Sequence, residues 1–201
     1  MANKGKSSSG AHRLSSSFVL GFHGCDRKVG ETLIAGEAFR PSDNNYDWLG
    51  PGIYFWENNW QRGLEFAHEQ MRRRDSKVKQ PFVIGAVIEL GACLDLTTKV
   101  SIDLVRVAHA VLMGELEKSG VPVPVNSRDH MRHNLDCAVI NRAHRIAASD
   151  ADIGPIQTVK GVFVEGDAAY PGADFREKTH IQIAVCDPSC IKGVFHVRDS
   201  T

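Results

Sequence analysis

The sequence predicts an α+β fold, in which an antiparallel or mixed β-sheet carries flanking helices. The apolar periodicity gives strand, helix, strand, helix and strand in that order, then a pair of helices, then further strands. The last strands are joined by turns and not by the helical crossovers that a parallel sheet needs. At 201 residues, 42% of them hydrophobic, the chain suits one domain with a sizeable core.

The N-terminal part begins with a polar stretch and then alternates between strand and helix. Residues 1–16 are rich in serine, so we expect a disordered tail before a single domain over residues 17–201. The first strand, residues 18–24, ends on a histidine and a glycine. A short helix follows, capped by Asp26 and running to about Gly36.

The stretch 47–57 is the part of the chain around which we expect the rest to be organised. Its Gly-Pro-Gly at 50–52 has the composition of a tight turn. A short aromatic strand follows, in which alternate side chains face opposite sides, Ile53 with Phe55 and Tyr54 with Trp56. One pair can pack in the core while the other lines a cleft. The alternative is an ordinary buried strand after an ordinary turn.

The next helix, residues 59–74, presents an unusual surface. Asn58 or Asn59 can cap it. Phe66 lies off its apolar stripe and shares a face with Gly63, so an aromatic ring stands beside a notch that a ligand could fill. The strand that follows, residues 82–90, is apolar on both alternations, which is typical of a central strand buried on both faces.

Two amphipathic helices, about residues 102–118 and 127–148, form an insert before the last strands. We expect the insert, about residues 102–148, to pack as a lid or docking platform beside the functional site. The alternative is that these helices belong to the core. The remaining segments are predicted strands at residues 158–165, 179–186 and 191–197.

Composition excludes several classes of function. Twenty-four basic residues balance 24 acidic ones, so no global charge favours nucleic acid or an anionic membrane. No apolar run is long enough to span a membrane, and the N-terminus lacks the apolar region of a signal peptide. Five cysteines without a C-x-x-C pair indicate free thiols in a reducing compartment. We therefore expect a cytoplasmic protein, with specialised export left open.

Common catalytic and metal-binding patterns are missing. His130 and His133 could lie one helical turn apart, but without a third ligand a solvated helix face is favoured over a metal site. Cys186 and Cys190 are spaced wrongly for zinc. The chain has no glycine-rich phosphate loop and no G-x-S-x-G elbow, so we expect neither nucleoside-triphosphate chemistry nor serine hydrolysis.

Several segments, taken in order, resemble a known family. They are Phe-His-Gly-Cys at 22–25, Gly-Pro-Gly-Ile-Tyr-Phe at 50–55, the helix at 59–74 and the buried strand within 83–96. This combination resembles the ADP-ribosyltransferases of the poly(ADP-ribose) polymerase and diphtheria-toxin type. The resemblance covers about residues 18–96 and, more loosely, 179–185. It implies the split sheet of that family and a single catalytic domain.

The resemblance implies a site for NAD, which these enzymes use as a substrate. His23 would hydrogen-bond the adenosine ribose, the Gly24 backbone would meet the nicotinamide carboxamide, and Tyr54 would stack on the nicotinamide ring. Phe66 would form the second wall around that ring. An electron-poor ring gains stacking energy between aromatic side chains, and glycine allows close approach to the backbone. We predict that His23 and Tyr54 lie on adjacent strands and share one face and one pocket.

The third position of the family is a glutamate on a late strand, and the chain departs from the pattern there. Alignment of the strand leaves His180 or Gln182 near the expected place, while Glu177 lies in the preceding loop. We favour Gln182, whose carboxamide oxygen can accept a bond from a ribose hydroxyl but carries no charge. His180 would lie toward the pyrophosphate or the acceptor. The missing charge weakens electrostatic stabilisation and argues against polymer elongation.

The resemblance therefore implies a mono-ADP-ribosyltransferase, in the manner of a toxin or effector, that releases nicotinamide from NAD. The acceptor, a protein or a nucleic acid, would be set by the loop at residues 166–178. An NAD glycohydrolase, with water as acceptor, needs the same pocket. A catalytically inactive module that binds NAD or a partner is the alternative from a different class.

Overall fold

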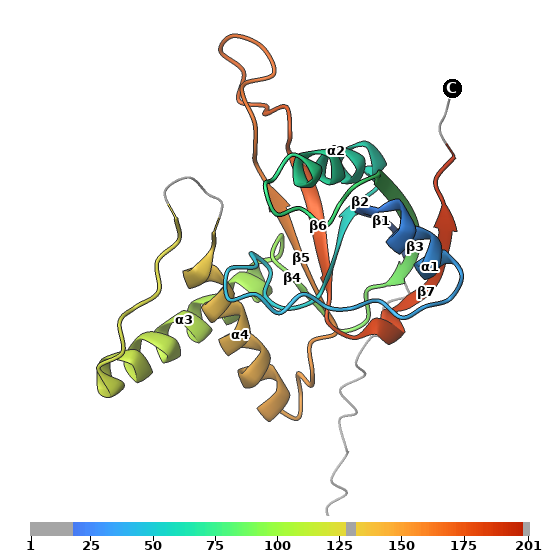
Figure 1. The fold of residues 1–201 in the computed structure, drawn as a ribbon. Coiled ribbons are helices and arrows are strands. Elements are labelled where there is room, and N and C mark those ends of the chain that lie inside the picture. Colours follow the sequence, from blue (N-terminus) through green and yellow to red (C-terminus); the bar gives the residue numbers. More distant parts are fainter. Residues whose placement is uncertain (1–17, 128–131, 199–201) are drawn as a thin grey trace, which may run out of the picture.

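The computed structural model describes residues 18–127 and 132–198, which form a seven-stranded mixed sheet with four α-helices (Figure 1). The predicted α+β class is confirmed. The expected tail, residues 1–16, lies outside the described part of the chain.

The helices and strands follow the predicted order, with one additional strand. The helices are α1 (Arg27–Ile34), α2 (Trp60–Met71), α3 (Lys99–Ser119) and α4 (Asn134–Ser149), with a 3-10 turn at Pro188–Cys190. The strands are β1 (Phe18–Asp26), β2 (Ile53–Glu57), β3 (Pro81–Glu89), β4 (Cys93–Asp95), β5 (Thr158–Phe163), β6 (His180–Val185) and β7 (Ile191–His196). The sequence missed β4, because three residues give no readable alternation.

The strands lie in the order β4-β5-β6-β2-β1-β3-β7. Only the β4–β5 pair is parallel among the described strands, and the others are antiparallel. The two segments of the family resemblance, β1 and β2, are therefore neighbours near the middle of the sheet. Long pairing with β3 holds β1, from Phe18 opposite Glu89 to Asp26 opposite Pro81.

The two faces of the sheet carry different helices. We call the face that carries Phe22, Trp56 and Gln182 the α2/α4 face, because α2 packs over β1, β2 and β3 and α4 packs over β5 and β6 (Figure 1). The opposite face carries Phe55 and Ile84 and is covered in part by α1, so we call it the α1 face. Side chains alternate between the two faces along each strand.

The α3–α4 pair is part of the main core. Ala143 and Ala147 of α4 are fully buried, and they share one apolar cluster with Val159 of β5 and Ala184 of β6. Ala108 of α3 is fully buried in the same cluster. This packing favours the core alternative over a separable lid for the insert.

The start of α4 differs from the prediction. The second insert helix was predicted from residue 127, whereas α4 begins at Asn134. Asn126 lies in the extended segment before it and accepts hydrogen bonds at Oδ1 from the N–H groups of Leu135 (2.9 Å) and Asp136 (3.2 Å). This side chain satisfies two N–H groups of the first turn. The helix therefore begins at Asn134, and Asn126 lies outside it.

Asp26 and Asn59 act as helix caps, as predicted. The Asp26 side chain accepts from the Lys28 N–H at 3.0 Å, and Asn59 accepts from the Arg62 N–H at 3.0 Å. Gly120 ends α3 in the left-handed conformation, with φ of 67°.

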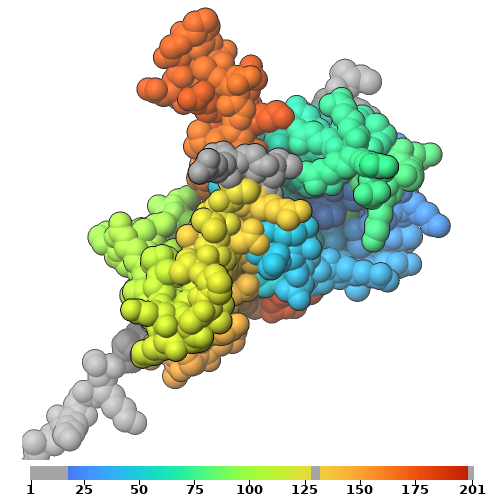
Figure 2. All heavy atoms as spheres, turned by 60° about the vertical axis from the view of Figure 1, so that its left-hand side comes forward, coloured from blue at the N-terminus to red at the C-terminus, as the bar shows by residue number. Residues whose placement is uncertain are grey.

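Residues 164–179, between β5 and β6, project beyond the body of the molecule (Figure 1). The tip of this loop stands clear of α2 and of the α3–α4 pair in the space-filling view (Figure 2). In the described part of the chain, no helix combines the length and apolar character needed to cross a membrane.

Candidate functional site

The ladder between β1 and β2 is short. Phe22 lies opposite Trp56, and the two strands are not paired beyond this point, at Gly24 and Tyr54. We call this place the β1–β2 split. It lies between two central strands, each of which is still paired with its other neighbour.

The split leaves the backbone of Gly24 directed toward β2. The Leu20 carbonyl accepts a hydrogen bond from the Asn58 N–H at 2.9 Å. In an antiparallel ladder alternate residues point their backbone groups to the same neighbour, so Leu20, Phe22 and Gly24 all point toward β2. An unbroken ladder would join the Gly24 N–H to the Tyr54 carbonyl.

His23 occupies the position of that missing ladder bond. Its Nδ1–H donates to the Tyr54 carbonyl at 2.8 Å, which is the only side-chain hydrogen bond of His23 within the described residues. Because a carbonyl only accepts, the proton lies on Nδ1, and Nε2 of the neutral ring is an acceptor. Burial lowers the pKa of His23 below its ordinary value of 6.5, more than this hydrogen bond raises it. The ring also packs against Phe39 and Phe55, with centroids at 5.9 and 5.6 Å.

Tyr54 has a structural contact that the sequence did not predict. Its hydroxyl accepts from the Leu49 N–H at 2.9 Å and donates to the Gly50 carbonyl at 2.7 Å. Burial raises the pKa of this hydroxyl. Tyr54 therefore fixes the turn that precedes its own strand.

The prediction that His23 and Tyr54 share a face is wrong, although the prediction that they lie on adjacent strands is confirmed. Phe22 and Trp56 are directly opposite and share the α2/α4 face. By alternation Tyr54 is on that face, whereas His23 is on the α1 face with Phe55. Alternation within one strand is readable from sequence, but the register between two strands is not, and a shift of one residue reverses the face.

Gly24 is needed for the packing of α2 on β1 as well as for a backbone that a ligand could approach at the split. A Cβ placed on Gly24 would lie 2.0 Å from the carbonyl oxygen of Gly63 in α2. The notch at Gly63 that the sequence suggested for a ligand is therefore filled by β1. Two glycines allow α2 to approach the sheet closely.

Phe66 contacts Trp56 and not Tyr54. The Phe66 and Trp56 ring centroids are 4.9 Å apart, and no ring contact between Phe66 and Tyr54 occurs in the described structure. The predicted pair of walls around one ring is therefore not formed by these two residues here. Trp56 is buried, and its Nε1 has no hydrogen-bond partner among the described residues.

Gln182 lies on the α2/α4 face, as Tyr54 does. It is half-buried and stands opposite Trp56 of β2 on one side and Gly161 of β5 on the other. Tyr54 and Gln182 therefore share a face, whereas the ring of His23 lies on the α1 face.

His180 and Glu177 lie at the end of the projecting loop, near α2. The His180 side chain is 1% exposed, and its Nδ1–H donates to the Lys178 carbonyl at 2.6 Å. Burial lowers the pKa of His180, and the nearby Glu165 carboxylate raises it by less. Contact between His180 and a ligand would require this part of the chain to move. Glu177 is exposed and lines a polar cavity of about 520 Å³ with Lys178.

A network of ion pairs fixes the base of the projecting loop to α2. Arg62, buried in α2, lies 3.4 Å from a carboxylate oxygen of Glu165 and 3.4 Å from one of Glu69. Lys178 lies 2.8 Å from Glu69. The loop therefore projects from a fixed base.

The sequence analysis missed an aromatic stack on the α2/α4 face. Trp48 stacks on His133 with centroids 3.9 Å apart and planes 7° apart. Phe163 contacts Trp48 with centroids at 3.8 Å and lies 5.6 Å from the His180 ring. The only sign of this stack in the sequence is that Trp48 lies shortly before the Gly-Pro-Gly turn.

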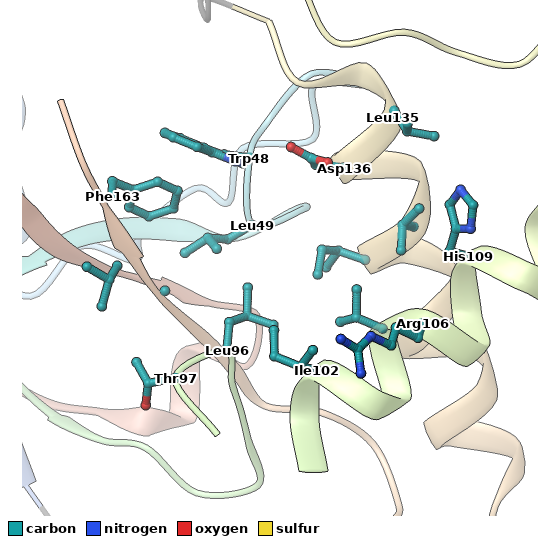
Figure 3. Close-up of a pocket in the computed structure, with 15 residues that line it drawn as sticks. Trp48, Leu49, Leu96, Thr97, Ile102, Arg106, His109, Leu135, Asp136 and Phe163 are labelled. Carbon is teal, nitrogen blue, oxygen red and sulfur yellow. The ribbon is translucent and has the colours of Figure 1, made fainter. Parts of the chain in front are cut away.

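A cavity of about 670 Å³ lies between the α3–α4 pair and β5 (Figure 3). Its walls are mainly aliphatic, and they include Leu49, Ile102 and Ile140. Neither this cavity nor the polar one is lined by His23 or Tyr54. Gly161, a glycine inside a strand, lies in the cavity wall and is the signal by which the sequence could have marked it.

No group of His, Cys, Asp or Glu side chains in the described residues has the arrangement of a metal site. His130 lies outside those residues, and His133 stacks on Trp48. The five cysteines are free thiols, as predicted.

Comparisons with known proteins give one relative and no family. The chain is 25% identical over 190 residues to the uncharacterized protein MJ0359 of Methanocaldococcus jannaschii, an alignment that covers 85% of this chain and 83% of the relative. No protein-family model matches the chain, and no solved structure matches it.

Proposed function

We propose that the chain is a mono-ADP-ribosyltransferase, which breaks the bond between nicotinamide and ribose in NAD and passes ADP-ribose to a macromolecular acceptor. The observation that supports this most is the hydrogen bond between His23 and the Tyr54 carbonyl at the β1–β2 split. It joins two of the segments on which the resemblance rests, although 31 positions separate the two residues in the chain.

The split offers the polar groups that a nicotinamide nucleotide would need. The Gly24 backbone presents a donor and an acceptor, which complement the carboxamide of nicotinamide. Nε2 of His23 can accept a bond from a ribose hydroxyl. A ligand placed between two separated strands can contact side chains on both faces, so the opposite orientations of His23 and Tyr54 are compatible with one site.

We assign the third catalytic role to Gln182. As the glycosidic bond breaks, its electron pair leaves with nicotinamide and positive charge grows on the ribose. Gln182 shares a face with Tyr54 and can orient a ribose hydroxyl through its carboxamide oxygen. The nucleophile of the acceptor then bonds the same ribose carbon and releases its proton.

The projecting loop supports a macromolecular acceptor. Tyr170 is 56% exposed and Phe175 is 71% exposed, and both belong to the loop that stands clear of the body. Exposed aromatic side chains are frequent anchors in protein interfaces. We assign acceptor binding to this loop.

The test is release of nicotinamide from NAD by the purified chain, with and without cell extract. Release that requires extract, with ADP-ribose found on a macromolecule, supports the transferase. Release that is independent of extract indicates the NAD glycohydrolase. If no nicotinamide is released but NAD binds, the chain is an inactive NAD-binding module, and absence of both contradicts the proposal.

Variants assign the residues. His23→Ala should lower nicotinamide release at least about 10-fold, whereas His196→Ala, an exposed histidine on β7, should leave it unchanged. Gln182→Ala should lower turnover about 10- to 1000-fold with little change in NAD affinity, and Gln182→Glu should retain or raise it. Loss of turnover in Glu177→Ala but not in Gln182→Ala would move the third role to the loop.

A further inference from the structure

The larger cavity lies outside the β1–β2 split, and nothing in the proposed reaction uses it. It is lined by the turn before β2, by α3 and α4, and by β5 (Figure 3). Its volume of about 670 Å³ lies within the range of ligand pockets, roughly 300–1,000 Å³, and protein interiors are otherwise packed with few voids.

The walls of the cavity are fixed by contacts that do not involve a ligand. Trp48 is held between the rings of His133 and Phe163, and the Leu49 N–H is bonded to the Tyr54 hydroxyl. On the helical side, α3 and α4 are joined by an ion pair between Glu115 and Arg142. The cavity is therefore formed before any ligand binds.

Gly161 lets apolar side chains pack closely against the strand side of the cavity. A Cβ at this position would lie 3.1 Å from Cδ2 of Leu49 and 3.6 Å from Cδ1 of Leu96. Because glycine weakens a strand, its presence there is typical of a place where another group approaches the backbone.

Three ionisable side chains line the cavity, namely Asp136, Arg106 and His109. Figure 3 shows the Asp136 carboxylate directed from α4 toward Trp48, above Leu49. Its nearest partner is Nδ1 of His133 at 3.4 Å, and no lysine or arginine of the described chain pairs with it. Arg106, on the opposite wall, is already paired with Asp103 at 3.1 Å. Asp136 is thus the charged side chain of the wall that has no lysine or arginine partner among the described residues.

We propose that this cavity binds a small amphipathic molecule with an apolar body and a cationic head. The body occupies the aliphatic space between Ile102, Val139 and Ile140, and the head approaches the Asp136 carboxylate. An apolar pocket with a few polar groups that fix orientation is the usual form of a small-molecule site. The inference does not depend on the proposed reaction with NAD.

The experiment compares three probes that share an eight-carbon chain: octylammonium, octan-1-ol and octanoate. Binding to the full chain is measured by calorimetric titration. Octylammonium should bind up to about 5-fold more tightly than octan-1-ol, and octanoate should bind most weakly, because one partly exposed ion pair contributes up to about 1 kcal/mol. Equal or tighter binding of octanoate would contradict the assignment of the head group.

One matched pair of variants and one further variant locate the site. Val105→Trp places a large ring in the cavity and should abolish binding, whereas Val107→Trp, on the same helix and 52% exposed, should not. Asp136→Asn should remove the preference for octylammonium over octan-1-ol and keep binding of the alcohol. Melting temperatures confirm that each variant is folded. Absence of saturable binding by all three probes, or equal loss in both tryptophan variants, would overturn the proposal.

Discussion

The β1–β2 split and the cavity beside α3 and α4 show two ways in which this fold leaves space near its sheet. At the split the side chain of His23 donates to the Tyr54 carbonyl, which would accept from a backbone N–H in an unbroken ladder. The backbone of Gly24 points toward β2. At the cavity the hydrogen bonding of β5 with β6 is complete along the strand, and the space lies between the apolar side chains of α3, α4 and β5. The first space suits hydrogen-bonding groups and the second suits apolar ones.

The two regions also depend on the fold in different ways. The split is held from both sides by strands and by α2, which approaches β1 through Gly24 and Gly63. The cavity is held by α3 and α4, whose packing is continuous with the main core. Three changes test this difference, and the first should have the largest effect.

Replacing α3 and α4, residues 99–149, by a Gly–Ser linker should leave the chain unfolded or insoluble. The replacement uncovers Val159, Phe163 and Ala184, which are buried in the cluster that α4 completes. Each large apolar side chain exposed in this way costs about 1.5–3 kcal/mol, and the whole stability of a domain is about 5–15 kcal/mol. Circular dichroism and solubility are the measurements. A soluble core that binds NAD would show that the helices are a separable lid.

Gly24→Ala should destabilise the fold by about 1–3 kcal/mol or more, because the new methyl group meets the Gly63 carbonyl and α2 must move. The matched control is Gly114→Ala in α3, where a Cβ meets nothing within 4 Å. That change should stabilise the chain by about 0.5–1 kcal/mol, since alanine favours helix over glycine. Urea unfolding of both variants measures the contrast. Similar values for the two would mean that α2 does not pack on β1 at this point.

The stability should decrease as the pH falls below about 6.5. Burial lowers the pKa of His23, His144 and His180 in the folded chain, whereas in the unfolded chain each takes up a proton near its ordinary value of 6.5. Unfolding therefore takes up protons below that pH, with a slope of up to about 1.4 kcal/mol per pH unit for each histidine.

Urea unfolding between about pH 5 and pH 7.5 measures this slope. His180→Asn, which keeps a donor near the Lys178 carbonyl, should reduce it, and His68→Asn, at an exposed position of α2, should not. A slope of zero in the unmodified chain would mean that these rings are solvated in the folded state.

The sequence alone determined the class of fold, most of the element order, and the starts of two helices. Asp26 could be predicted directly and Asn59 as one of two neighbouring asparagines, because a cap depends on a few neighbouring residues. Tyr54 and Trp56 could likewise be placed on the face opposite to Ile53 and Phe55, because alternation depends only on neighbouring residues of one strand. These features require no knowledge of distant parts of the chain.

Only the tertiary structure decided which face each strand presents to its neighbour. The pairing of Phe22 with Trp56 places His23 and Tyr54 on opposite faces, although a hydrogen bond joins the His23 ring to the Tyr54 backbone. The same is true of Gly24 and Gly63, whose contact depends on the position of α2. Register and helix packing are set by the sum of many weak long-range contacts, and no single stretch of sequence contains that sum.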